Sequence, residues 1–123
     1  MKTVVSFSFA ASSDNDRTVM GADADQIVDQ LAPLAPAAFG ANCGVGPDVA
    51  VKLVQRYRRG WDGPVWIKPN AGLPQLIEGK TVFSASPQDF ASYVPALLNV
   101  GADFIGGCCG STPDHIRAAA ELL

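Results

Sequence analysis

The three cysteines are the residues whose type and spacing suggest chemistry. Cys108 and Cys109 are adjacent in the glycine-rich stretch GGCCG, and Cys43 stands far upstream in the stretch NCGVGP. Neighbouring side chains of an extended strand point to opposite faces, so both adjacent sulfurs reach one point only if the chain turns there. The flanking glycines permit such a turn because they adopt backbone angles closed to other residues. The pattern predicts two loops that aim their thiols at a common ligand.

Three thiolates with an open fourth position form a plausible catalytic zinc site. Two other interpretations of the cysteines remain open at this point. In the first, Cys108 and Cys109 form a strained vicinal disulfide. In the second, they are small buried residues of a packed layer. The glycine-rich stretches also suggest phosphate loops at helix N-termini, although neither matches a known phosphate-binding pattern. An odd number of cysteines argues against a disulfide framework and favours a metal or a reactive thiol.

Length and composition predict one soluble globular domain over residues 1–123. Hydrophobic residues make up 48% of the sequence and the formal net charge is −3, which gives no electrostatic footprint for nucleic acid. No apolar stretch reaches the roughly 18 residues that a membrane helix needs. The start MKTVVSFSFAASS superficially resembles a secretory signal, but serines interrupt its apolar run and a strand is the better interpretation. We therefore expect a reducing, cytoplasmic location.

A short β-rich segment is followed by a loop and a helical pattern four times along the chain. The expected strands are Val4–Phe9, Ala38–Asn42, Val65–Lys68 and Phe104–Gly107. The expected helices cover 23–34, 47–59, 86–100 with a kink at Pro95, and a final segment capped by Ser111 or Thr112. In the final helix, Ile116, Ala119 and Leu123 are the expected buried residues.

Repeated strand–helix alternation predicts an α/β fold with a parallel sheet and with function in the loops that follow the strands. An open doubly wound sheet and a (β/α)8 barrel both satisfy the pattern. A complete barrel typically takes about 250 residues and eight units. The cysteine stretches both fall at carboxyl ends of expected strands, where loops of different units meet.

Three stretches together resemble the zinc-dependent homocysteine S-methyltransferase family, which includes the homocysteine-binding domain of cobalamin-dependent methionine synthase. They are NCGVGP at 42–47, PNAG at 69–72 and GGCCGSTP at 106–113, in family order over nearly the whole chain. The resemblance implies that Cys43, Cys108 and Cys109 ligate Zn²⁺. It also implies that homocysteine binds through its sulfur and that its thiolate attacks an activated methyl group, giving methionine.

The resemblance implies four βα units corresponding to the C-terminal half of a (β/α)8 TIM barrel. The family's early strands, with a glycine-rich stretch that shapes the homocysteine pocket, have no counterpart in this sequence. Because four strands cannot close a barrel, we expect a homodimer or docking with a separate N-terminal half-barrel chain. The alternative is a non-catalytic zinc- or thiol-binding half-barrel module. The PNAG and GPD stretches resemble cobalamin-dependent members of the family, which implies methylcobalamin bound on another domain or chain as methyl donor. S-methylmethionine, betaine and methylfolate-linked systems share this half of the family and stay open as donors.

Other polar residues near expected strand ends are weaker candidates. Asn42 and Asn70 either orient the amino-acid part of homocysteine or hydrogen-bond the loop backbone. We expect His115, in the first turn of the last helix, to lie on the surface rather than to bind zinc. The remaining candidates are polar residues near the first strand, expected at inner-layer or solvated loop positions: Ser6, Ser8, Ser12, Asp14 and Asp16.

Overall fold

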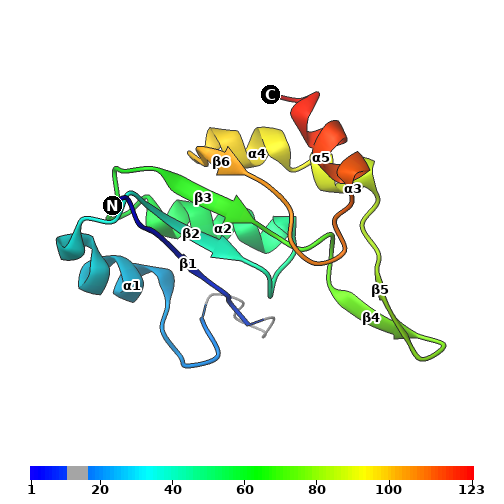
Figure 1. The fold of residues 1–123 in the computed structure, drawn as a ribbon, viewed down its shortest axis with the longest axis horizontal. Coiled ribbons are helices and arrows are strands. Elements are labelled where there is room, and N and C mark those ends of the chain that lie inside the picture. The colour runs from blue at the N-terminus through cyan, green and yellow to red at the C-terminus, as the bar shows by residue number, and fades with distance from the viewer. Residues whose placement is uncertain (11–16) are drawn as a thin grey trace.

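The computed structural model describes residues 1–10 and 17–123 (Figure 1). Its strands are β1 (Val4–Phe7), β2 (Ala38–Asn42), β3 (Val65–Lys68), β4 (Pro74–Ile77), β5 (Lys80–Phe83) and β6 (Phe104–Ile105). Its helices are α1 (Ala24–Leu31), the 3-10 helix η1 (Ala32–Leu34), α2 (Pro47–Tyr57), α3 (Pro87–Ala91), α4 (Val94–Asn99) and α5 (Pro113–Ala120).

Four of these strands form one parallel sheet in the order β1-β2-β3-β6. Each sheet strand is followed by a helical segment, so the chain consists of four βα units. The α/β class and the half-barrel arrangement expected from the sequence are confirmed. All carboxyl ends of parallel strands meet at the same edge, which brings the loops after β2, β3 and β6 together.

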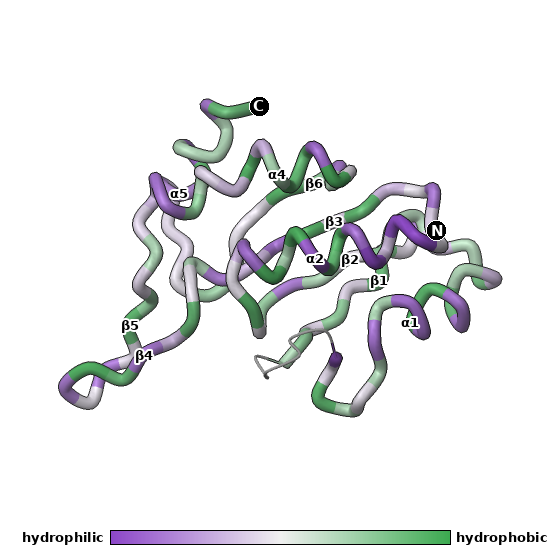
Figure 2. The backbone as a smooth tube through the Cα atoms, turned by 180° about the vertical axis from the view of Figure 1, so that it is seen from behind, coloured by the Kyte–Doolittle hydropathy of each residue, from purple (hydrophilic) through white to green (hydrophobic). Residues whose placement is uncertain are grey.

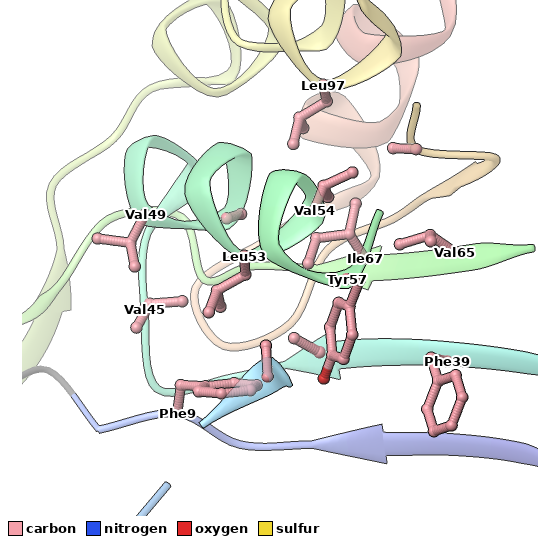
Figure 3. Close-up of a cluster of buried hydrophobic side chains, with 14 of the residues drawn as sticks. Phe9, Phe39, Val45, Val49, Leu53, Val54, Tyr57, Val65, Ile67 and Leu97 are labelled. Atoms are coloured by element: carbon pink, nitrogen blue, oxygen red, sulfur yellow. The ribbon is translucent and has the colours of Figure 1, made fainter. Parts of the chain in front are cut away.

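The helices cover one face of the sheet and bury the main hydrophobic core against it (Figure 3). Helix α2 lies at the centre, with Leu53 and Val54 fully buried over Phe39 of β2 and Ile67 of β3. The Tyr57 hydroxyl donates a 2.9 Å hydrogen bond to the Gly40 carbonyl, which satisfies a polar group inside this core. The apolar residues spaced three to four positions apart along this helix therefore form its buried face: Val49, Leu53, Val54 and Tyr57.

Helix boundaries follow capping signals that are visible in the sequence. Asp23 caps α1 by accepting from the Gln26 N–H, while the Gln26 side chain accepts from the Asp23 N–H. The expected helix at 86–100 divides into α3 and α4 around Ser92 and Tyr93, consistent with the predicted kink near Pro95.

The segment after β3 differs most from the expected structure. The sequence analysis placed no strand between Lys68 and the helix at 86–100, but β4 and β5 pair as an antiparallel hairpin that projects from the body (Figure 1). Its turn residues Glu78 and Gly79 both have positive φ, of 49° and 75°. Polar residues mix with apolar ones through this stretch, so alternation did not mark the strands. Figure 2 shows hydrophobic residues along the projecting hairpin, where Leu76 is 77% exposed.

The last helix corrects two sequence-based expectations. His115 is buried rather than on the surface, because its ring packs edge-on against Phe90 at 5.8 Å between centroids. Ala119 is buried as expected, but Ile116 and Leu123 are exposed rather than buried. The helix turns His115 and Ala119, four residues apart, toward α3, with which it makes its main contacts.

The opposite face of the sheet carries no helical layer among the described residues. Val4, Ser6 and Phe104 on this face are exposed, whereas Ala41 and Ile67 on the other face are buried. Strands β1 and β6 are the two edges of the sheet. No helix in the described part of the chain combines the length and the apolar character needed to cross a membrane.

Candidate metal centre

Cys43 is presented by a tight turn directly after β2. Its backbone has φ of 60°, a left-handed conformation that costs a non-glycine residue on the order of 1–3 kcal/mol. Its N–H donates to the Lys68 carbonyl at 3.1 Å, and its own carbonyl accepts from Val45 at 2.8 Å. Gly44 follows with φ of 73°, and an added Cβ there would lie 1.9 Å from the Phe9 carbonyl oxygen. The backbone of this turn is therefore closely confined.

Cys108 and Cys109 follow β6 in a loop that is tied to the end of β3. The Cys108 N–H donates to the Pro69 carbonyl at 2.9 Å, and the Cys109 carbonyl accepts from the Ala71 N–H at 2.9 Å. Gly110 then takes φ of 79°, and a Cβ at this position would approach Phe83 of the hairpin to 2.3 Å. The chain turns at Gly110, as the glycine-rich pattern predicted.

The three sulfurs meet at the carboxyl edge of the sheet. Their Sγ atoms lie within 4.8 Å of one another, and the Cys43 and Cys109 sulfurs are 3.2 Å apart. All three thiols are free, and Cys109 is the most exposed of them. The tertiary structure thus brings together cysteines from two βα units that are far apart in the sequence.

The proximity of the thiols shifts the pKa values of Cys43 and Cys109 in opposite directions. Hydrogen bonds from the Cys109 thiol, and secondarily from the Cys108 thiol, lower the pKa of Cys43 below its ordinary value of 9.0. The Cys43 sulfur raises the pKa of Cys109 to about 11, first through their hydrogen bond and then through its charge. One thiolate is favoured in this cluster, and each further ionisation places like charges together.

The donor set suits a soft divalent metal such as zinc. Zn–S bonds of about 2.3 Å at tetrahedral angles place sulfur atoms about 3.8 Å apart, a separation between the 3.2 Å of Cys43 and Cys109 and the 4.8 Å within which all three sulfurs lie. Three thiolates leave the fourth tetrahedral position for another ligand. The residues fit a zinc ion, and their role as its ligands stays a prediction.

The two asparagines of the sequence analysis have different surroundings. Asn70 is buried, and its side-chain oxygen accepts from the Cys109 N–H at 3.1 Å. It therefore hydrogen-bonds the cysteine loop, one of the two roles considered for it. Asn42 is half-buried at the end of β2, and its side-chain oxygen accepts a 2.6 Å hydrogen bond from the Ser6 hydroxyl.

The other polar candidates do not join the sulfur cluster. Ser6 is exposed within β1 on the face without helices, and Ser8 is exposed directly after this strand. Ser12, Asp14 and Asp16 lie outside the described residues.

Both ring nitrogens of His115 have partners within the protein. Nδ1 accepts from the Thr112 N–H at 3.2 Å, so Nε2 carries the proton and donates to the Ala85 carbonyl at 3.0 Å. His115 is a structural residue that holds the return from the hairpin. The spacing Thr112 to His115, an N-cap followed by its third helical residue, is the signal that sequence reasoning missed.

The fold and the cysteine cluster together define the class of protein. It is a (β/α)-barrel protein, present here in part, with a thiol cluster at the carboxyl ends of its strands. The sequence model of the family described as homocysteine S-methyltransferase matches residues 1–123, so the chain belongs to that family.

Known proteins of this family resemble the chain in sequence and in fold. Methionine synthases from Mycobacterium leprae and Mycobacterium tuberculosis are both 31% identical to it over 106 residues, or 85% of this chain. The metallated form of the homocysteine methyltransferase MmuM from Escherichia coli is 27% identical over 96% of the chain, with a TM-score of 0.70. The oxidized form of MmuM is 26% identical over 95% of the chain, with a TM-score of 0.69.

The chain spans only part of these proteins. The matches cover 9% of each methionine synthase and 35% of MmuM in either of these two forms.

Proposed function

We propose that Cys43, Cys108 and Cys109 bind one zinc ion and that this site activates the thiol of homocysteine for methyl transfer, giving methionine. The convergence of three thiols within 4.8 Å, in a member of the homocysteine S-methyltransferase family, carries the proposal. A zinc ion supplies positive charge that favours thiolate over thiol. Homocysteine loses its thiol proton to solvent, and its sulfur bonds to the methyl carbon as the methyl–donor bond breaks.

The chain's own residues prepare this reaction by holding three sulfurs in place. The backbone hydrogen bonds of Cys43 and Cys108 fix both loops to the end of β3, and Asn70 holds the Cys109 N–H. Asn42 is proposed to contact the amino-acid part of homocysteine, because its side chain lies on the face without helices beside Ser6. Methylcobalamin, carried by another domain or chain, is the proposed methyl donor.

Metal content and the sulfur shell test the first part of the proposal. Purified protein should bind about one zinc per complete site, and X-ray absorption should show sulfur as its main ligand. A shell of nitrogen and oxygen alone would contradict the proposed ligands. Protein with oxidised thiols has to be reduced before loading, because only thiolates ligate zinc.

Substrate binding tests the activation step. L-homocysteine should release a proton when it binds the zinc-loaded chain, whereas methionine, whose thioether has no proton to lose, should bind weakly. Calorimetry in buffers of different ionisation enthalpy measures this release. Binding without proton release would remove the proposed activation.

The two sheet edges bear on whether the chain works alone. No strand among the described residues pairs with the outer edge of β1 or β6, and four parallel strands do not close a barrel. We propose that a second copy of this chain, or a separate N-terminal half-barrel chain, pairs with these edges. Light scattering after size exclusion at micromolar concentration should give a homodimer. A cooperatively melting monomer of 12.8 kDa would contradict this pairing.

A non-catalytic zinc- or thiol-binding module is the second candidate, and the open edges of the sheet favour it. Methyl-transfer assays separate the two functions. The purified chain is assayed alone and with candidate partner chains, using methylcobalamin, S-methylmethionine, betaine and a methylfolate-linked system as donors. Methionine formation with any donor supports the enzyme, and zinc binding without methionine in every combination supports the module.

A further inference from the structure

Lys68 is the only charged residue within the four strands of the parallel sheet. It pairs in register with Asn42 of β2, so both side chains lie on the sheet face without helices. The neighbouring pair, Ala41 and Ile67, is buried beneath the helices on the opposite face. A lysine at this place is therefore not a residue of the helix-covered core.

The side chain of Lys68 lies across Gly106, the residue that follows β6. A Cβ added to Gly106 would come within 3.1 Å of the Lys68 Cγ. The Lys68 ammonium lies 5.3 Å from the centroid of the Trp66 ring, and this ring stacks on Phe104 at 5.2 Å. The cation thus rests on the aromatic surface that Trp66 and Phe104 form on the face without helices.

The ammonium has no carboxylate partner among the described residues. The ion pairs of this part of the chain all use arginines: Arg17, Arg56, Arg58, Arg59 and Arg117. A cation on an aromatic surface, with no counter-ion among residues 1–10 and 17–123, is available to an anionic group of a ligand.

Lys68 also adjoins both cysteine loops through its backbone. Its carbonyl accepts from the Cys43 N–H at 3.1 Å, and the carbonyl of the next residue, Pro69, accepts from the Cys108 N–H at 2.9 Å. The lysine thus ends β3, which lies between the two strands that lead into the cysteine loops. A small molecule held by its sulfur at the cluster can extend across the end of β3 toward this side chain.

We propose that the Lys68 ammonium binds the α-carboxylate of the amino-acid thiol whose sulfur is held at the cysteine cluster. This inference rests on the proposed function, because it concerns the substrate of that same site. Removing a carboxylate from water requires a charged or hydrogen-bonding partner, and Lys68 supplies both. Its flexible four-carbon stem lets the ammonium leave the Trp66 ring and follow the carboxylate.

Truncated thiols separate a carboxylate contact from binding through sulfur. The chain is loaded with Co²⁺, whose sulfur-to-metal absorption reports thiol binding, and is titrated with three thiols. L-homocysteine carries both polar groups, 4-mercaptobutanoate lacks the amine, and 3-aminopropane-1-thiol lacks the carboxylate. Lys68→Met should lower the affinity for the two thiols that carry a carboxylate by about tenfold, the effect of losing one charge-assisted hydrogen bond. It should change the affinity for 3-aminopropane-1-thiol by less than about twofold.

Two matched variants control for charge and for folding. Lys80→Met removes the same charge from the exposed strand β5 and should leave all three affinities unchanged. Lys68→Arg keeps the charge, and its affinities for the two carboxylate-bearing thiols should stay within about threefold of those of the unsubstituted chain.

The outcomes distinguish this inference from the proposed function. Equal weakening of all three thiols by Lys68→Met would overturn the carboxylate contact and assign Lys68 to the structure of the loops. Unchanged binding of all three would overturn it as well. Failure of the unsubstituted Co²⁺-loaded chain to bind any thiol would overturn the proposed function itself.

Discussion

The helix-covered face of the sheet and its carboxyl edge are built by different forces. Under α2, side chains such as Leu53, Val54 and Ile67 are almost completely buried, so the hydrophobic effect holds that region together. At the carboxyl edge, backbone hydrogen bonds hold two tight turns, and the cysteine side chains are only partly covered. The edge leaves its thiols partly uncovered because backbone hydrogen bonds, with the Asn70 side chain, supply the local structure.

This difference predicts that substitutions in the two regions have separable effects. Changes at the carboxyl edge should remove metal binding while the fold is kept, and changes beneath α2 should remove the fold while folded molecules still bind metal.

Loss of one sulfur should have the largest effect. Cys43→Ser should lower zinc affinity by at least about a hundredfold, because structural zinc sites gain on the order of 10–16 kcal/mol from their ligands together. Competition with a chromophoric chelator measures the affinity, and circular dichroism should show an unchanged fold. Thr81→Ser in the exposed strand β5 is the control and should bind zinc like the unsubstituted chain. Full zinc loading of Cys43→Ser would contradict the proposed ligand set.

A cavity in the helix-covered core should lower the stability of the fold and leave metal binding by folded molecules intact. Leu53→Ala should lower the free energy of unfolding by about 3 kcal/mol, since it removes a fully buried side chain. Phe104→Ala, on the open face where Phe104 is 49% exposed, should cost less than about 1 kcal/mol in a monomer. Urea denaturation at several protein concentrations measures both. A large, concentration-dependent cost for Phe104→Ala would show that a second copy covers this face.

Loss of the Asn70 hydrogen bond should have an intermediate effect on the metal site. Asn70→Ala leaves the Cys109 N–H without its acceptor and should weaken zinc binding about tenfold, as loss of a supporting residue typically does. Asn70→Asp keeps an acceptor oxygen at this position and should lose less. Equal zinc affinities for the alanine variant and the unsubstituted chain would show that the loop backbone alone fixes Cys109.

Proton competition should make zinc affinity depend on pH. The pKa of Cys109 is raised to about 11, so its thiol remains protonated in the metal-free protein at pH 7–9 and must lose that proton to bind zinc. Zinc affinity should therefore rise with pH, by about tenfold per pH unit for each proton displaced. Chelator competition at pH 7, 8 and 9 measures the slope. A slope near zero would mean that the thiols are already ionised without metal.

The sequence by itself determined the βα units, the caps and the residues that carry the chemistry. Periodicity marked the buried stripe of α2, since an amphipathic helix needs apolar residues every three to four positions. Proline and an N-capping residue marked the starts of α3 and α5, because both act within one helical turn. These signals are local, so they are legible without the fold.

Only the tertiary structure decided what distant segments do to one another. The 3.2 Å approach of Cys43 and Cys109, the burial of His115 against Phe90, and the stacking of Trp66 on Phe104 all depend on packing. The hairpin of β4 and β5 was missed because its strands are exposed and lack an alternating pattern. Sequence fixes the type of each side chain and its local backbone preference, but a shared sheet edge places residues from different βα units within bonding distance.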